Sequence, residues 1–170
     1  MKQLPLISTA LYCQPWCILP EAHVELGQLY RRYLDGKLVP EQLEGSKRVS
    51  SGIRYDVDPS GVCLISLEGI VAKRTPDMMC GPQIIDLSQL DNLIKRAARD
   101  EEIKTVVFYL DTPGGCGIGL AETSANIQDL IDAGKRVVAY TDYLCASAGY
   151  WLAASCQEIY AAPSAQVGSI

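Results

Sequence analysis

The chain of 170 residues has few aromatic residues and a single histidine, with one phenylalanine and two tryptophans. A triad of serine, histidine and aspartate needs a histidine as its base, and His23, near the N-terminus, is the only one available. The chain also lacks a basic excess, because its net charge is −5. That charge argues against non-specific binding to nucleic acid or anionic lipid. We therefore expect no histidine-based triad and no nucleic-acid partner.

Long apolar runs are absent too, and none could span a bilayer. The first 20 residues are interrupted by prolines and lack the layout of a signal peptide, so we expect a cytoplasmic protein. The seven cysteines are scattered and odd in number, which predicts free buried thiols rather than disulfides. Cys13, Cys17 and His23 lack the spacing of a zinc finger and a second pair of ligands. We expect neither a metal nor a cofactor.

The chain divides into two regions of different character. Residues 1–55 form an expected N-terminal arm and linker, with a helix over 25–34 and a polar linker over 47–58. Residues 56–170 form one expected domain in which strands and helices alternate. The hydrophobic pattern predicts strands over 62–71, 105–110, 136–140 and 158–161, and helices over 86–99, 119–133 and 147–156. Such alternation through short loops implies an α/β fold with a parallel sheet, and a further strand is expected to begin near residue 166.

Two motifs follow neighbouring strands. Asp111-Thr112-Pro113-Gly114-Gly115 is a turn that should leave both glycine amides free, and Ala146-Ser147-Ala148-Gly149 opens an uncharged helix that we expect to be buried. In parallel α/β sheets, ligands bind outside the carboxyl ends of the strands. Together the motifs could supply amide donors for an oxyanion and a hydroxyl nucleophile. The alternatives are a turn without a ligand and a structural N-cap serine. With no histidine nearby, a nucleophilic Ser147 would need a lysine as its base.

These motifs, with the run from Ala162-Pro163 to Val167-Gly168-Ser169-Ile170, resemble the signal peptide peptidase A or protease IV family. The segment 15–21 is similar to the start of the bacteriophage capsid protease C branch of that family. The resemblance covers roughly residues 61–170 and extends weakly into the arm. It implies a Clp-protease/crotonase-like fold, which is a spiral of ββα units, and we expect that spiral to be incomplete at the C-terminal end of this chain.

The resemblance also implies a catalytic site. Ser147 matches the family nucleophile, and the backbone amides of Gly114 or Gly115, with that of Ala148, would form the oxyanion hole. The family's catalytic lysine lies beyond the segment that matches 167–170, so we expect the 170 residues alone to be nearly inactive. Lysines 95, 104 and 135 are expected to be solvated, and Lys73 is at best a substitute base.

The expected partners follow from the same resemblance. Substrates would be extended peptides, and in the phage branch these are capsid or scaffold proteins during head maturation. Family members form rings, so a homo-oligomer is expected. Two other functions stay open. One is a non-catalytic capsid assembly or scaffold protein on the same fold. The other is a crotonase-like acyl-CoA enzyme, although nothing in the sequence resembles an adenosine-phosphate site and Ser147 would then have no role.

Overall fold

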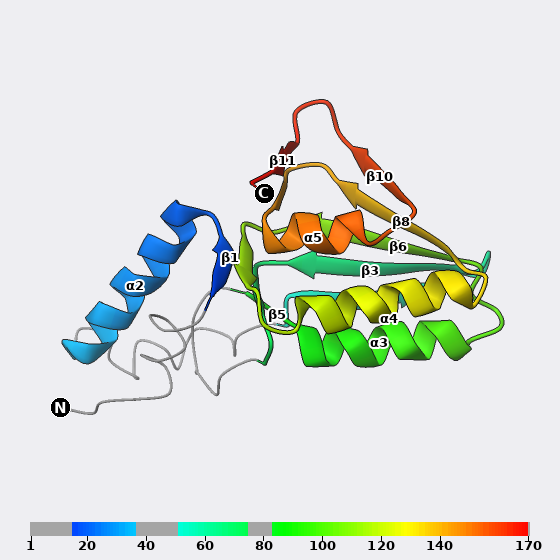
Figure 1. The fold of residues 1–170 in the computed structure, drawn as a ribbon, viewed down its shortest axis with the longest axis horizontal. Helices are drawn as coiled ribbons and strands as arrows, with labels where there is room; N and C mark the ends of the chain where they lie inside the picture. Colours follow the sequence, from blue (N-terminus) through cyan, green and yellow to red (C-terminus); the bar gives the residue numbers. More distant parts are fainter. Residues whose placement is uncertain (1–14, 37–50, 75–82, 170) are drawn as a thin grey trace.

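The computed structural model describes residues 15–36, 51–74 and 83–169. Its centre is a five-stranded sheet of order β10-β8-β6-β3-β2 (Figure 1). Four of these strands run parallel, namely β3 (Val62–Glu68), β6 (Thr105–Asp111), β8 (Arg136–Thr141) and β10 (Glu158–Ala161), while β2 (Ile53–Val57) is an antiparallel edge strand. The α/β class with a parallel sheet is therefore confirmed.

Short strands form two further sheets. β1 (Trp16–Ile18), β7 (Gly114–Cys116), β4 (Ile70–Ala72) and β5 (Ile84–Asp86) lie in the order β1-β7-β4-β5, and β9 (Leu144–Ala146) pairs with β11 (Gln166–Gly168). Along the chain, β6 and β8 are each followed by a short strand and then by a helix, as β6-β7-α4 and β8-β9-α5, and β3 is followed by the short strands β4 and β5 and then by α3. This repeated order is the ββα unit that the family resemblance implies.

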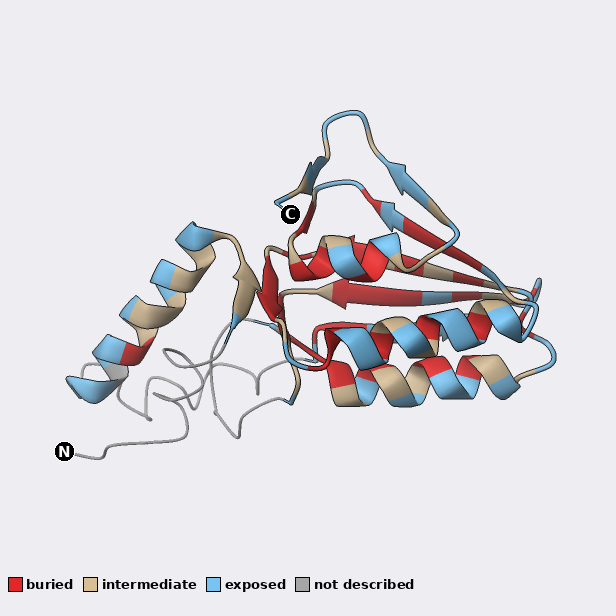
Figure 2. Cartoon of the chain, viewed as in Figure 1, coloured by how far each residue is buried: buried red, intermediate tan, exposed pale blue. Residues whose placement is uncertain are grey.

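The helices cover the sheet along one side. They are α3 (Leu87–Arg99), α4 (Leu120–Asp132) and α5 (Ala148–Ala154), and they pack on one another in that order. The predicted spacing on α3 is confirmed, since Leu87, Leu90, Ile94 and Ala97 are buried. The core lies between these helices and the inward face of β6, where Val106, Phe108 and Leu110 are buried (Figure 2).

Three local predictions are wrong. The strand expected over 62–71 is two strands, because Gly69, at φ 108°, turns the chain from one sheet into another. A Cβ at Gly69 would lie 2.2 Å from the Gln83 carbonyl oxygen, so a larger residue does not fit there. The expected linker contains β2, which pairs along its whole length with β3. The helix after Ser147, which we expected to be buried because it carries no charge, is only half buried. Its outer side is exposed to solvent, with Trp151 46% exposed.

The N-terminal arm is described from residue 15. Its helix α2 (Pro20–Leu34) begins five residues earlier than expected, and Pro20 at the first turn favours that start because proline needs no amide donor there. α2 stands beside the sheets (Figure 1), and its Tyr30 is buried, whereas Val24 is 55% exposed. The division of the chain at 55/56 stays a prediction. No helix within 15–36, 51–74 or 83–169 is both long and apolar enough to cross a membrane.

Candidate active site

Three segments that are distant in the sequence meet at the carboxyl ends of the parallel strands. The amide of Thr112 donates to the Leu144 carbonyl at 2.8 Å, and the amide of Ala146 donates back to the Thr112 carbonyl at 3.0 Å. The amide of Ser147 donates to the Gly168 carbonyl at 2.8 Å. The backbone itself therefore joins the three motifs that the sequence singled out, and Ser147 lies where they meet.

Ser147 has an unusual backbone conformation, with φ 53° and ψ −111°. It stands between the end of β9 and the first residue of α5, and its side chain makes no capping hydrogen bond to that helix. The N-cap alternative therefore has no hydrogen bond to support it. A strained serine on a sharp strand-to-helix turn is the geometry that exposes the nucleophile in hydrolases with a G-x-S-x-G motif. This chain reaches similar local geometry without that motif.

Gly114 lies directly against Ser147. A Cβ on Gly114 would be 3.0 Å from the Ser147 Cβ and 2.3 Å from the Cys17 carbonyl oxygen, and its φ of 99° favours glycine. Its amide donates to the Thr112 hydroxyl at 3.0 Å. The expectation of a free amide at this position is therefore wrong, because the buried Thr112 side chain accepts from it.

Gly115 and Ala148 are the other expected oxyanion donors. Gly115 lies in β7, opposite Cys17 of β1 on one side and Val71 of β4 on the other. Ala148 is completely buried and is the first residue of α5. Its amide is therefore one of the amides of the first helical turn, which have no hydrogen-bond acceptor within the helix. The roles of Gly114, Gly115 and Ala148 in holding an oxyanion stay predictions.

Thr112 is a residue whose importance sequence reasoning missed. Its side chain is completely buried, its hydroxyl accepts from Gly114, and its methyl group faces Gly149, where a Cβ would lie 2.2 Å from the Thr112 Cγ2 atom. One side chain thus sets both the turn before β7 and the distance to α5. The signal in the sequence was a β-branched hydroxyl residue inside the turn motif.

Two lysines of the described residues, Lys104 and Lys135, are bonded to carbonyls far from Ser147. Lys104 donates to the Glu101 carbonyl at 2.6 Å, and Lys135 donates to the Asp100 and Ile103 carbonyls at 2.5 and 2.8 Å. These contacts lie at the amino ends of β6 and β8, opposite the end that carries Ser147. Lys135 is half-buried, not solvated as expected. The Lys73 side chain lies against Gly119, at the start of α4.

Acidic and phenolic groups gather near the same strand ends. The Tyr109 hydroxyl donates to Asp142 at 2.8 Å, and this hydrogen bond, with burial, raises the pKa of Tyr109 to about 12. Burial, and then the charges of Glu68 and Asp142, raise the pKa of Asp111. Cys145 is buried, and burial raises the pKa of its thiol to about 11, which keeps the sulfur protonated and fits the expected packing role.

Metal binding finds no support in the described part of the chain. No group of three histidine, cysteine, aspartate or glutamate side chains there could hold an ion. The His23 ring instead packs near Trp16, with 5.7 Å between ring centroids. Cys13, the third member of the zinc set weighed from the sequence, lies outside the described residues.

Comparison with known proteins points to peptidases. Residues 129–170, which include Ser147, match Peptidase family S49. The chain is 25% identical to Protease 4 of Haemophilus influenzae over 117 residues, 68% of this chain and 18% of that protein. It is 34% identical to Protease 4 of Salmonella typhi over 77 residues, 45% of this chain and 12% of that protein. A solved structure of a probable enoyl-CoA hydratase from Mycobacterium smegmatis has a TM-score of 0.48 and 21% identity, covering 66% of this chain and 49% of that one.

The chain therefore spans less than a fifth of the length of these two Protease 4 relatives. The match to the family profile falls on β8, β9, α5, β10 and β11, the elements that build the turn around Ser147. The motif Asp111-Thr112-Pro113-Gly114-Gly115 lies outside that matched stretch, yet its backbone is bonded to it through Leu144 and Ala146. These matches support the resemblance to Peptidase family S49, the signal peptide peptidase A or protease IV family.

Proposed function

We propose that the protein is a serine endopeptidase that cleaves peptide bonds through an acyl-enzyme on Ser147. The observation that carries the proposal is the conformation of Ser147, which is held at φ 53° by bonds from three segments and makes no capping bond to its own helix. Strained backbone of this kind persists only where surrounding structure enforces it, and it clusters at active sites.

The reaction would follow from the groups around that residue. The Ser147 hydroxyl oxygen attacks the scissile carbonyl carbon, its proton passes to a base, and the carbonyl oxygen becomes an oxyanion. The amide of Ala148, in the first turn of α5, and that of Gly115 in β7 would donate to that charge. Collapse of the intermediate expels the amine and leaves an ester on Ser147, which water then hydrolyses.

The base in this proposal is a lysine outside the 170 residues. Support comes from the contacts of Lys104 and Lys135, whose ammonium groups are bonded to carbonyls at the far end of the sheet, and from the family resemblance. A peptidase that lacks its base keeps only the fraction of activity that oxyanion stabilisation and binding supply. The 170 residues alone are therefore nearly inactive.

The biological setting is a further part of the proposal. The segment Pro15 to Glu21 is similar to the start of the phage capsid protease C branch, which favours capsid or scaffold proteins as substrates during head maturation. Cleavage would take place in the host cytoplasm or the phage prohead, by a homo-oligomer. An unfolded segment of such a protein would be bound as an extended strand.

The test is cleavage of an unfolded protein by the product of the complete reading frame that contains these residues. Parent protein should cleave it, Ser147→Ala should lose cleavage by several orders of magnitude, and Ser155→Ala should match the parent. Ser155 is a suitable control because it lies at the end of the same helix, where its hydroxyl donates to the Trp151 carbonyl. Equal cleavage by the parent and Ser147→Ala would overturn the proposal. Binding of coenzyme A thioesters without cleavage would favour the acyl-CoA alternative.

A further inference from the structure

Strand β1 of the N-terminal arm occupies the outer edge of β7, beside Ser147. It runs antiparallel, with Trp16, Cys17 and Ile18 opposite Cys116, Gly115 and Gly114. The amide of Leu19 donates to the Pro113 carbonyl at 3.0 Å, and that of Gly117 donates to the Pro15 carbonyl at 3.1 Å. Bonded and non-bonded pairs alternate in an antiparallel ladder. Cys17 and Gly115, midway between these two bonds, therefore form a bonded pair in which the Gly115 amide faces the Cys17 carbonyl.

The carbonyl of Cys17 consequently accepts from an amide that the proposed function assigns to the oxyanion. Its oxygen faces the amide of Gly115, one of the expected oxyanion donors. A Cβ placed on Gly114 would touch both this oxygen and the Ser147 Cβ, at 2.3 and 3.0 Å. The arm's backbone and Ser147 thus both lie against Gly114.

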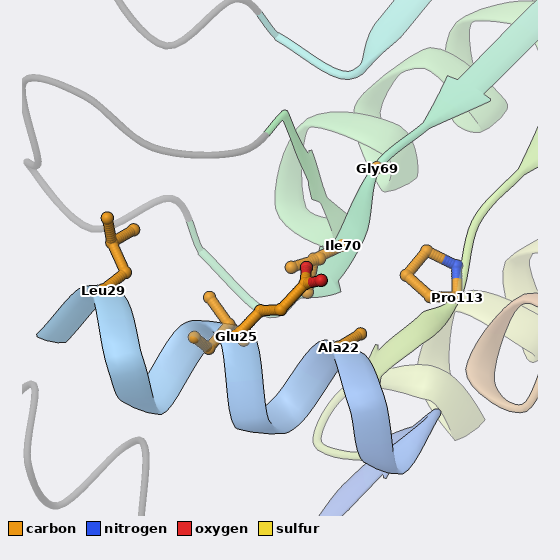
Figure 3. A pocket seen from close by; sticks show the side chains of 7 residues that line it. Ala22, Glu25, Leu29, Gly69, Ile70 and Pro113 are labelled. Atoms are coloured by element: carbon orange, nitrogen blue, oxygen red, sulfur yellow. The ribbon is translucent and has the colours of Figure 1, made fainter.

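The arm is attached loosely to the rest of the protein. Its strand is three residues long, and α2 beyond it leaves an open groove of about 470 Å³ against the body of the protein. Figure 3 shows Glu25 and Ala22 directed from α2 toward Ile70 and Pro113 across this groove, which Leu29 also lines. Elements with few buried contacts open at low free-energy cost, so another strand could replace β1 without unfolding the core.

We propose that the β7 edge is a binding site for an extended peptide and that β1 is an internal occupant which such a peptide must displace. The inference rests on the proposed function in taking the bound peptide to be a substrate, but peptide binding at the β7 edge needs no catalysis. The peptide would run antiparallel to β7, as β1 does. Its side chain in the place of Cys17 would lie against Gly117, as Cys17 does, and we expect a small one there, since the Cys17 Sγ lies 3.3 Å from where a Cβ of Gly117 would be.

Two variants shift the occupancy of the edge in opposite directions. Cys17→Pro removes the amide that pairs with Gly115 and should release β1. Gly117→Cys places a thiol beside Cys17, close enough for a disulfide, and should lock β1 in place when oxidised. Glu21→Pro is the control for the first variant, because the first turn of a helix tolerates proline. The parent, treated with the same oxidant, is the control for the second.

The probe is a fluorescent peptide of residues 15–21 with alanine in place of Cys17, measured by fluorescence anisotropy with the full chain. We expect Cys17→Pro to bind it at least tenfold more tightly than the parent and Glu21→Pro do. Oxidised Gly117→Cys should bind it at least tenfold more weakly than the same protein after reduction. A peptide with phenylalanine at the Cys17 position should bind more weakly than the alanine peptide.

Equal affinity in all forms, or binding by none of them, would overturn the inference. Should Cys17→Pro fail to fold, the oxidised and reduced states of Gly117→Cys decide the question within one protein. The assay measures binding alone and requires no cleavage by the protein. A failure of the proposed peptidase function would therefore leave this binding result unchanged, and the two failures are distinguishable.

Discussion

Gly149 on α5 faces the buried Thr112 methyl group, and replacing it tests whether that contact sets the geometry around Ser147. Helix propensity alone predicts that Gly149→Ala stabilises the protein by about 1 kcal/mol. The new Cβ, however, would lie 2.2 Å from the Thr112 Cγ2 atom, and overpacking of a core typically costs about 1–3 kcal/mol. We therefore expect Gly149→Ala to lower the free energy of unfolding by up to about 2 kcal/mol.

Removing the methyl group should relieve this clash. Thr112→Ser keeps the hydroxyl that accepts from the Gly114 amide and loses one buried methyl, at about 1 kcal/mol. In the double variant, alanine at 149 has the space it needs. We expect a favourable coupling of about 1–2 kcal/mol between the two substitutions, within the range for residues in contact.

The assay is urea unfolding followed by tryptophan fluorescence, for the parent, the two single variants and the double variant. Ala125→Gly, at an exposed position of α4, calibrates helix propensity in this protein and should cost about 1 kcal/mol. Stabilisation by Gly149→Ala alone, or additive effects in the double variant, would refute the packing account of Thr112.

Three further predictions concern the backbone and the charges near the site. Ser147→Gly should be more stable than Ser147→Ala by about 1 kcal/mol or more in thermal or urea unfolding, since only glycine relieves a strained conformation of this kind; equal stabilities would contradict the strain. The pKa of Tyr109, about 12, lies above its ordinary 10.0, so the contribution of this hydrogen bond to stability is complete below about pH 10 and is lost as the pH rises through about 12. Asp142→Asn should move that ionisation toward pH 10 in an absorbance titration, and an unchanged titration would contradict the assigned bond. The pKa of Asp111 is also raised, by burial first and then by Glu68 and Asp142, so its ionisation destabilises the fold as the pH rises through the acidic range. Asp111→Asn should therefore unfold at a higher urea concentration than the parent at pH 7 and at a similar concentration at pH 3. A variant that unfolds at a lower urea concentration than the parent at pH 7 would contradict this account.

Much of the central fold could be predicted from local patterns. The strand at 105–110 is a continuous apolar run, and α3 shows its buried residues at helical spacing, so both lie close to where we expected them. The three-residue strands could not be predicted in this way. Gly114 to Cys116 has no periodicity, and its partner at Trp16 to Ile18 lies about a hundred residues away in the sequence. Such pairing is decided by the tertiary fold, not by local preference.

The candidate site was predictable in outline and not in detail. The resemblance selected Ser147 and the glycine turn, and the structure brings them together. The bond from the Gly114 amide to Thr112 is local, and its signal in the sequence was the hydroxyl residue inside the turn motif. The positive φ of Ser147 could not be predicted, because it depends on neighbours from other strands. The occupation of β7 by the arm was hidden for the same reason.

The central claim is that Ser147 is a nucleophile supported by the surrounding amides, and labelling tests it most directly. The product of the complete reading frame is treated with a peptide phosphonate, and the modified residue is located by mass spectrometry of its fragments. Our account predicts one label, on Ser147, that is absent from Ser147→Ala and much weaker in the 170 residues alone. No label in the longer protein would contradict the account and favour a non-catalytic assembly protein, and a label on any other serine would show that the nucleophile lies elsewhere.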